Sequence, residues 1–147
     1  LKMQDVKSIE NKAGGIIIDT GSPHYVSICK DLDNLNVQIE GAKIRNTSLF
    51  LEEGINVNFV DPIDSKNFAM RTFERGVEGE TLSCGTGATA VAIAMHASQK
   101  TNSNCIKLQT QGGDLEVQFR SKDLSYFDVW LRGSVRYVYE GTFEDNF

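Results

Sequence analysis

Cys84 is the residue of this sequence whose surroundings point most clearly to chemistry. It lies in the stretch "FERGVEGETLSCGTGATA", between a charged run and a Gly-Thr-Gly turn that opens a segment of small apolar residues. If a helix begins at about Gly85, the thiol lies at the helix N-terminus, where unpaired backbone N–H groups and the macrodipole favour negative charge. Thiolates in such positions act as nucleophiles or as bases. The pattern therefore predicts a reactive cysteine.

The same helix N-terminus offers a binding function. The backbone N–H groups of Gly85, Thr86 and Gly87 can bind an anionic ligand such as a carboxylate, and both functions can operate together. Each part also has a purely structural explanation, because most lone cysteines are buried, Gly-Thr-Gly sequences form tight turns, and charged runs are usually solvated. All three features fall within one short stretch, and this coincidence favours the functional interpretation.

The helix that would position Cys84 is predicted over residues 85–100, "GTGATAVAIAMHASQK". Its alanines favour helix, and residues 88–97 carry almost no charge on any face, so we expect it to be buried nearly all round. A buried helix needs strands around it. The predicted fold class is therefore α+β, with a curved, mostly antiparallel sheet wrapped around a central apolar helix.

Short strands separated by turn residues make up most of the remaining sequence. The period-two alternation of Leu115, Val117 and Phe119 with polar neighbours is typical of a half-buried strand. A second, shorter helix is predicted over residues 36–45, capped by Asn36, although Gly41 in its middle weakens the pattern. The strand candidates are residues 16–19, 24–29, 56–60, 68–73, 106–110, 115–120, 127–131 and 135–140.

Composition and charge narrow the classes of partner. The chain has 147 residues and a net charge of −5, and without a basic run it is unlike nucleic-acid binders and polybasic membrane anchors. It has no apolar segment of membrane-spanning length, and its first ten residues lack the apolar core of a signal peptide. Three cysteines, Cys29, Cys84 and Cys105, form no CxxC pair, which indicates a reducing, cytoplasmic setting. Small polar molecules are the expected partners.

The stretch "ERGVEGETLSCGTGATA" resembles the second active-site motif of the diaminopimelate epimerase family, which is close to ERG-x-GET-x-x-CGTG, with one extra residue within residues 76–80. The segment "GSPHYV" is similar to a Gly-Asn-Pro-His segment of the family, and "GINVNFV" is similar to its Val-Asn-x-x-Phe strand. The segments "GGDLEVQF" and "YEGTF" follow in the expected order. The resemblance covers the chain from about Gly15 to its end.

The other half of the family's site is not found in this sequence. Family enzymes have two similar halves, and the first carries a second catalytic cysteine in an Asn-Cys-Gly-Asn-Gly-like motif. Neither Cys29 nor Cys105 has glycine neighbours of that kind. The resemblance therefore implies that residues 1–147 form a single C-terminal domain, that the N-terminal domain lies outside this chain, and that the isolated chain is inactive.

The activity implied by the resemblance is the epimerisation of LL-diaminopimelate to meso-diaminopimelate, in lysine and peptidoglycan-precursor biosynthesis. Inverting this stereocentre without pyridoxal requires two monoprotic groups on opposite faces of the carbon. Cys84 would be one, and the missing half would supply the other, without a cofactor or a metal. The implied partners are the small-molecule substrate and the missing N-terminal domain, with no nucleic acid and no membrane. A homodimer is left open.

The resemblance also implies roles for residues around the thiol. Glu74 and His24 join Cys84 as catalytic residues, and together they would tune or relay protons for the thiols. Glu74 would also contact a substrate ammonium group, and the N–H groups of Gly85 and Thr86 would hold the α-carboxylate. Structural alternatives are a loop hydrogen bond for His24 and a solvated surface pair for Glu74 and its neighbour.

The distal end of the substrate has its own implied residues. Arg75 would bind the distal carboxylate in a forked geometry, with Asn56 helping to hold that end. Ser22 stands where the family usually has asparagine, so its contact would run through its hydroxyl, a water or its backbone. Asn56 has the structural alternative of capping a turn. His96, on the buried helix, is expected to be a hydrogen-bonded core or helix-end residue.

Two other functions stay open at this point. A related two-cysteine racemase acting on proline or hydroxyproline shares the CGTG turn, but its motif resembles Asp-Arg-Ser-Pro-Cys-Gly-Thr-Gly, and "FERGVEGETLSCGTG" differs from it. A non-catalytic half-domain, kept for assembly or ligand binding, is the second alternative. The joint presence of Cys84, Glu74 and Arg75 argues against it.

Overall fold

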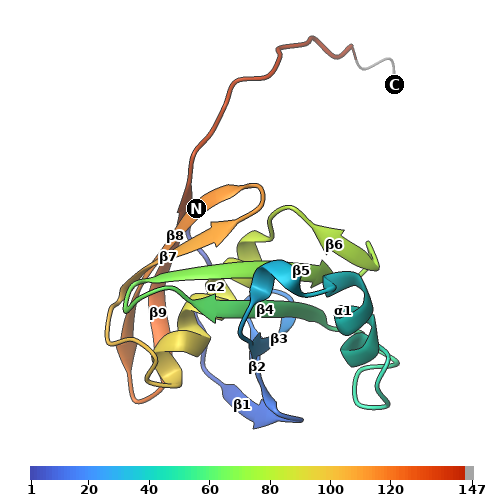
Figure 1. Cartoon of the computed structure of the whole chain (residues 1–147). Coiled ribbons are helices and arrows are strands. Elements are labelled where there is room, and N and C mark those ends of the chain that lie inside the picture. Colours follow the sequence, from blue (N-terminus) through green and yellow to red (C-terminus); the bar gives the residue numbers. More distant parts are fainter. Residues whose placement is uncertain (145–147) are drawn as a thin grey trace.

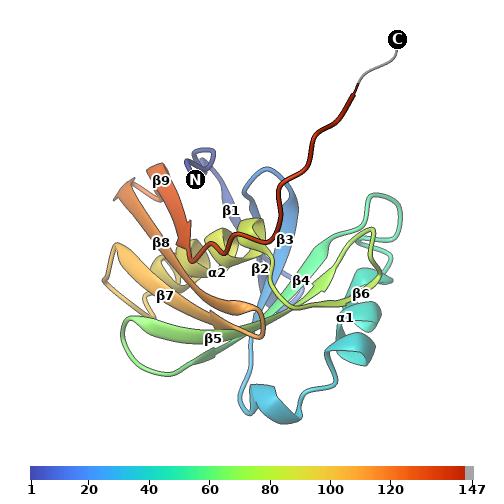
Figure 2. The same ribbon diagram turned by 90° about the horizontal axis from the view of Figure 1, so that it is seen from above.

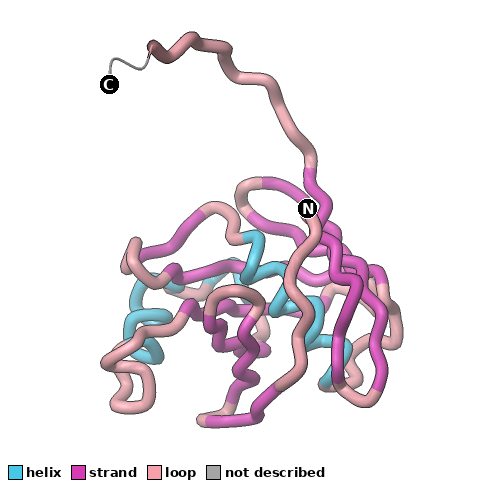
Figure 3. Tube along the Cα trace, turned by 180° about the vertical axis from the view of Figure 1, so that it is seen from behind, coloured by secondary structure: helices cyan, strands magenta, loops and turns pink. Residues whose placement is uncertain are grey.

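A computed structural model describes residues 1–144 of the chain and shows an α+β fold that is mostly sheet (Figure 1). Two α-helices and one short 3-10 helix, η1, interrupt the strands (Figure 3). None of the helices in this range is long and apolar enough to cross a membrane. The elements in chain order are β1 (Ile9–Lys12), β2 (Gly15–Asp19), β3 (Pro23–Ile28), η1 (Leu32–Asn34), α1 (Val37–Arg45), β4 (Asn56–Pro62), β5 (Asn67–Glu74), β6 (Gly79–Thr81), α2 (Gly85–Ala97), β7 (Cys105–Thr110), β8 (Gly113–Lys122) and β9 (Ser125–Gly133).

The strands form one mixed sheet in the order β1-β2-β3-β4-β5-β7-β8-β9, with β6 paired to β5. Two pairs are parallel, β3 with β4 and β5 with β7, and the other pairs are antiparallel. The strand patterns alone did not predict the parallel pairs. Parallel neighbours need a long crossover connection, and α1 and α2 lie in the two connections concerned.

The residues that precede β1 run along the free side of β9. Lys2 pairs with Trp130 and Val6 pairs with Tyr126, both in antiparallel fashion. Val6 and Tyr126 exchange two backbone hydrogen bonds, each 2.8 Å long. Because this segment leads directly into β1, it connects the first strand of the sheet with the last, and Figure 2 shows the N-terminus close to β9.

Helix α2 lies within the main hydrophobic core. All residues from 87 to 95 are buried, and the helix contacts β2, β3, β4, β5, β7, β8 and β9. Its alternating small residues allow strands to approach on every side, which a helix with larger side chains would prevent. Strand residues such as Val26, Phe68 and Val117 complete this core.

A second core cluster lies beneath α1, which packs on β4 and β5. As expected, Asn36 is the N-cap, with its side chain accepting from the N–H of Ile39, and the helix ends before Asn46. Gly41, which weakened the sequence pattern, is required by this packing. A Cβ atom at position 41 would lie 2.3 Å from the Cβ atom of Phe73 on β5.

The prediction of a strand over residues 135–140 is wrong. The segment after β9 has no regular structure up to residue 144 and leads away from the body of the molecule (Figure 1). Its apolar residues are exposed, with Val135 98% and Val138 81% accessible. Strand-forming residues need a partner edge, and both sides of β9 are occupied, by β8 and by the N-terminal segment.

Candidate active site

Cys84 is the N-cap of α2, and its backbone is extended (φ −134°, ψ 111°). Its sulfur accepts a hydrogen bond from the backbone N–H of Gly87, with an N–S distance of 3.4 Å. The first turn of α2 contains no acidic residue that would compensate the helix dipole. The residue is 8% exposed. The sulfur therefore lies at the positive end of the α2 dipole.

Thr86 links the sulfur to a buried histidine. Its Oγ1 lies 3.4 Å from the sulfur of Cys84 and 3.0 Å from Nε2 of His24, which β3 places beside the start of α2. Burial lowers the pKa of His24 from 6.5 to about 4; the charge of Asp19 opposes this effect, and that of Arg75 adds to it. His24 is thus a neutral imidazole at neutral pH.

Two further residues continue this chain of contacts, and the sequence analysis missed both. Nδ2 of Asn58 on β4 lies 3.0 Å from Nδ1 of His24, and the hydroxyl of Thr72 on β5 donates to Oδ1 of Asn58 over 3.0 Å. The available signal was a second asparagine two residues after Asn56 in an otherwise apolar strand. We call Thr72, Asn58, His24, Thr86 and Cys84 the Cys84 network.

The CGTG turn leaves two backbone N–H groups without a partner in the described part of the chain and packs closely on its neighbours. No acceptor within residues 1–144 is hydrogen-bonded to the backbone N–H of Gly85 or of Thr86. A Cβ atom at Gly87 would lie 2.4 Å from Oδ1 of Asn58 and 3.2 Å from the sulfur of Cys84. Gly87 is therefore needed for the helix to approach the network this closely.

Asn56 connects the loop before β3 to the end of β5. Its Nδ2 donates to Oγ of Ser22 (2.8 Å) and to the carbonyl of Pro23 (2.9 Å), and its Oδ1 accepts from the backbone N–H of Arg75 (2.9 Å). The residue is 4% exposed. All polar groups of this side chain are engaged within the protein, so Asn56 positions Ser22 and Arg75 relative to each other.

Arg75 and Glu74 lie at the end of β5. Nη1 of Arg75 donates to the carbonyl of Glu53 over 2.9 Å, and no carboxylate within residues 1–144 forms an ion pair with Arg75. The carboxylate of Glu74 accepts from the hydroxyl of Thr81 on β6 over 2.9 Å. Among residues 1–144 no hydrogen bond joins Glu74 to Cys84 or to His24, whereas Thr86 connects His24 to the sulfur.

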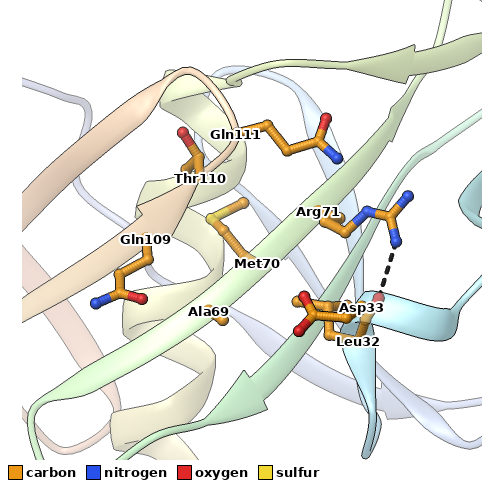
Figure 4. Close-up of a pocket in the computed structure, with 8 residues that line it drawn as sticks. All are labelled: Leu32, Asp33, Ala69, Met70, Arg71, Gln109, Thr110 and Gln111. Carbon is orange, nitrogen blue, oxygen red and sulfur yellow. Dashed lines mark hydrogen bonds between the residues drawn. The ribbon is translucent and has the colours of Figure 1, made fainter.

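Other polar features lie outside this cluster. A cavity of about 310 Å³ is lined by Leu32, Arg71 and Gln109, among others (Figure 4). Arg71 is held there by two hydrogen bonds to Glu80 and by two from Nη1 to the carbonyls of Leu32 and Leu35. As expected, His96 is a hydrogen-bonded helix-end residue, 2.9 Å from the hydroxyl of Tyr126. Residues 1–144 contain no group of three metal-binding side chains.

The chain is similar in sequence to known epimerases and in fold to a solved isomerase. A diaminopimelate epimerase of Flavobacterium psychrophilum is 46% identical over 142 residues, which cover 97% of this chain and 56% of that protein. A diaminopimelate epimerase of Aquifex aeolicus is 42% identical over 127 residues, which cover 86% of this chain and 45% of that protein. The crystal structure of a methylitaconate-delta-isomerase has a similar fold, with a TM-score of 0.57 and 14% identity over 86% of this chain and 46% of that chain.

The matches cover most of this chain but only part of each relative. The chain spans about half the length of the curated relatives it matches. The model of the family described as diaminopimelate epimerase matches residues 16–138. With the CGTG turn and its cysteine at the N-terminus of a buried helix, this chain belongs to the diaminopimelate epimerase family.

Proposed function

We propose that this chain is the C-terminal domain of an epimerase that converts LL-diaminopimelate to meso-diaminopimelate, and that it supplies one of two acid/base thiols. The observation that carries the proposal is the environment of Cys84. Its sulfur accepts a hydrogen bond from the N–H of Gly87 and lies 3.4 Å from the hydroxyl of Thr86, while the adjacent N–H groups of Gly85 and Thr86 have no partner within residues 1–144. A base and an anion site thus lie side by side.

In the proposed reaction the thiolate of Cys84 takes the α-proton from one face of the substrate. The electron pair left on the carbon spreads into the α-carboxylate, which the N–H groups of Gly85 and Thr86 hold at the positive end of α2. A thiol of the N-terminal domain then delivers a proton to the opposite face. One proton is removed and one is added, so the reaction is a stereochemical inversion without redox change.

The distal end of the substrate would bind at the end of β5. The guanidinium of Arg75 has N–H groups available for the distal carboxylate beyond its bond to Glu53. Ser22 accepts a hydrogen bond from Asn56, which leaves its hydroxyl hydrogen available to a ligand. Asn56 would act through these two residues, and Glu74 would contact the substrate ammonium group from its position against Thr81.

We further infer that α2 is the central helix of a curved sheet, because seven strands contact it and its middle residues are buried all round. Such a helix holds Cys84 rigidly at one end of the core. The missing N-terminal domain would cover this end and exclude water, which strengthens the electrostatic stabilisation of the carbanion.

The test uses the 147-residue chain with LL-diaminopimelate in deuterium oxide under reducing conditions. Because only one thiol of the pair is present, we expect slow α-deuterium incorporation without formation of the meso isomer. Exchange should disappear in Cys84→Ala and persist in the matched control Cys105→Ala, whose thiol lies outside the site. Efficient conversion to the meso isomer would overturn the half-site proposal, and absence of exchange would overturn the role of Cys84 as base.

A further inference from the structure

The direction of the hydrogen bonds in the Cys84 network can be derived from a fixed acceptor at its buried end. Nδ2 of Asn58 lies 3.4 Å from the backbone carbonyl oxygen of Tyr25 and 3.0 Å from Nδ1 of His24. A carbonyl oxygen can only accept, so Asn58 must present its NH₂ group on this side. Its oxygen then faces Thr72, whose hydroxyl donates to it over 3.0 Å.

This orientation of Asn58 determines the tautomer of His24. Since Nδ1 accepts a hydrogen bond from Asn58, it carries no proton, and in a neutral imidazole the proton must then be on Nε2. Nε2 lies 3.0 Å from Oγ1 of Thr86, so His24 donates to that hydroxyl. The side chain is 0% exposed, and no other hydrogen bond of its ring is present within residues 1–144.

The last step concerns the hydroxyl hydrogen of Thr86. With a lone pair of Oγ1 occupied by His24, the sulfur of Cys84 at 3.4 Å is the acceptor that residues 1–144 offer to the hydroxyl hydrogen. In the order given for the Cys84 network, each side chain therefore donates a hydrogen bond to the next, and the sulfur of Cys84 is the final acceptor. A thiolate accepts such a bond, whereas a thiol competes to donate.

Packing keeps this arrangement in place. Asn58 is 0% exposed and Thr72 is 2% exposed, so water does not offer them alternative partners. Gly87 allows Oδ1 of Asn58 to lie against the first turn of α2. The charged groups that act on His24 are Asp19 and Arg75, and neither forms a hydrogen bond with its ring.

We infer that Asn58 and Thr72 are positioning residues, which hold His24 as its Nε2–H tautomer and thereby make Thr86 a hydrogen-bond donor to the thiolate of Cys84. The inference rests on the proposed function of Cys84 as a base. In this arrangement His24 is a fixed donor and does not exchange protons with the substrate. Asn58 and Thr72 act on the thiol through two other side chains, without touching the substrate.

The first experiment reads the tautomer directly by ¹⁵N NMR of the 147-residue chain labelled at histidine. We expect the His24 signals of a protonated Nε2 and an unprotonated Nδ1, unchanged from pH 8 to pH 5. A protonated Nδ1 would overturn the inference. This measurement does not depend on activity, so it separates failure of the inference from failure of the proposed function, which deuterium exchange tests.

The second experiment measures the rate of Cys84 alkylation by iodoacetamide against pH. Loss of one hydrogen bond to a charged acceptor should move the midpoint of this profile upward by about one pH unit in Thr86→Val. Thr86→Ser keeps the hydroxyl and should restore the wild-type profile. Asn58→Leu should give a mixture of His24 tautomers and an upward shift of roughly half a unit or more, because the Thr86 hydroxyl is no longer directed to the sulfur.

A third variant tests the same role with a smaller change to the packing of the core. Thr72→Val is nearly isosteric and removes only the donor to Asn58, so it should shift the alkylation midpoint in the same direction. Thr89→Val is the matched control, since this buried threonine of α2 donates to the carbonyl of Gly85 and lies outside the Cys84 network. If Thr72→Val behaves like Thr89→Val, with an unchanged profile and an unchanged His24 tautomer, the positioning role is overturned.

Discussion

At the scale of single residues, the three cysteines lie in different electrostatic environments. Burial raises the pKa of Cys29, and the nearby charge of Asp61 adds to this effect. Burial and the nearby charge of Glu116 likewise raise the pKa of Cys105. Cys84 instead accepts a backbone N–H bond at a helix N-terminus. The difference comes from the position of each thiol in the fold, since the three side chains are identical.

The lowered pKa of His24 predicts how the stability of the folded state depends on pH. Its pKa is lowered from 6.5 to about 4 by burial. The unfolded chain therefore takes up a proton near pH 6.5, while the folded chain stays neutral until about pH 4. The folded state loses stability as pH falls through this window, by up to about 3 kcal/mol, and the loss is absent above pH 6.5.

The measurement is the free energy of unfolding in urea between pH 7 and pH 4, for the wild type and for His24→Gln. The wild-type curve should fall more steeply, because glutamine does not titrate. His96→Gln serves as a control for a less buried histidine, whose pKa is also lowered by burial. Parallel curves for the wild type and His24→Gln would contradict the prediction.

The proposed role of Arg75 predicts which ligands the chain binds. Its guanidinium should form charge-assisted hydrogen bonds with the distal carboxylate, and their loss in Arg75→Met should weaken binding of diaminopimelate roughly 10- to 100-fold. Lysine lacks that carboxylate, so its weaker binding should not change in Arg75→Met. Isothermal titration of both ligands tests this.

The control for this titration is Arg132→Met, because Arg132 is exposed and pairs with Glu116 on the neighbouring strand. It should leave the affinity for diaminopimelate unchanged. Equal affinity of the wild-type chain for lysine and diaminopimelate would contradict the proposal that Arg75 binds the distal carboxylate.

At the scale of elements, the two helices pack against the sheet in different ways. Helix α2 uses small residues so that strands can approach on many sides, and its N-terminus stays available for chemistry. Helix α1 packs on one face of the sheet through Gly41, which lies against Phe73. Both also serve as crossover connections for the parallel strand pairs. The crossover through α1 thus places the strand of His24 beside that of Asn58, and the direct antiparallel connection from β4 to β5 places Thr72 next to Asn58.

Gly41 gives a test of the close contact between α1 and β5. Alanine is a better helix former than glycine by about 1 kcal/mol, so Gly41→Ala would stabilise an isolated helix. In this chain the added Cβ would meet Phe73 at 2.3 Å. We expect a net loss of roughly 1 to 3 kcal/mol in the free energy of unfolding. Glu40→Ala, on the exposed side of α1, should change it by less than about 0.5 kcal/mol. A stabilising Gly41→Ala would show that the helix does not pack this closely.

At the scale of the whole molecule, the site is built where distant segments meet. The Cys84 network combines side chains from β3, β4, β5 and the N-terminus of α2. The strands β3, β4 and β5, which carry most of the network, are consecutive in the sheet and pair directly with one another. Because the chain spans about half the length of its relatives, we propose that the second acid/base group comes from the domain that faces Cys84.

Local signals in the sequence were sufficient for most elements and for the reactive end of α2. Asn36 caps α1 and the helix ends at Arg45, as predicted, and the alternation in residues 115–120 corresponds to the centre of β8. The CGTG motif located the cysteine, because N-capping depends only on residues that are adjacent in the chain. The short strands β1 and β6 were missed, since three or four residues carry too weak a pattern.

Only the tertiary structure could reveal the parts that depend on contacts between distant residues. Residues 135–140 have strand-forming side chains, but β9 has no free edge for them. Asn58 looks like an isolated polar residue in an apolar strand, and it acquires a role only because β3 and β5 place His24 and Thr72 on either side of it. A helix cap is a local interaction that the sequence itself encodes. The direction of hydrogen bonds toward Cys84 depends on a carbonyl, an amide, an imidazole and two hydroxyls that only folding brings within reach of one another.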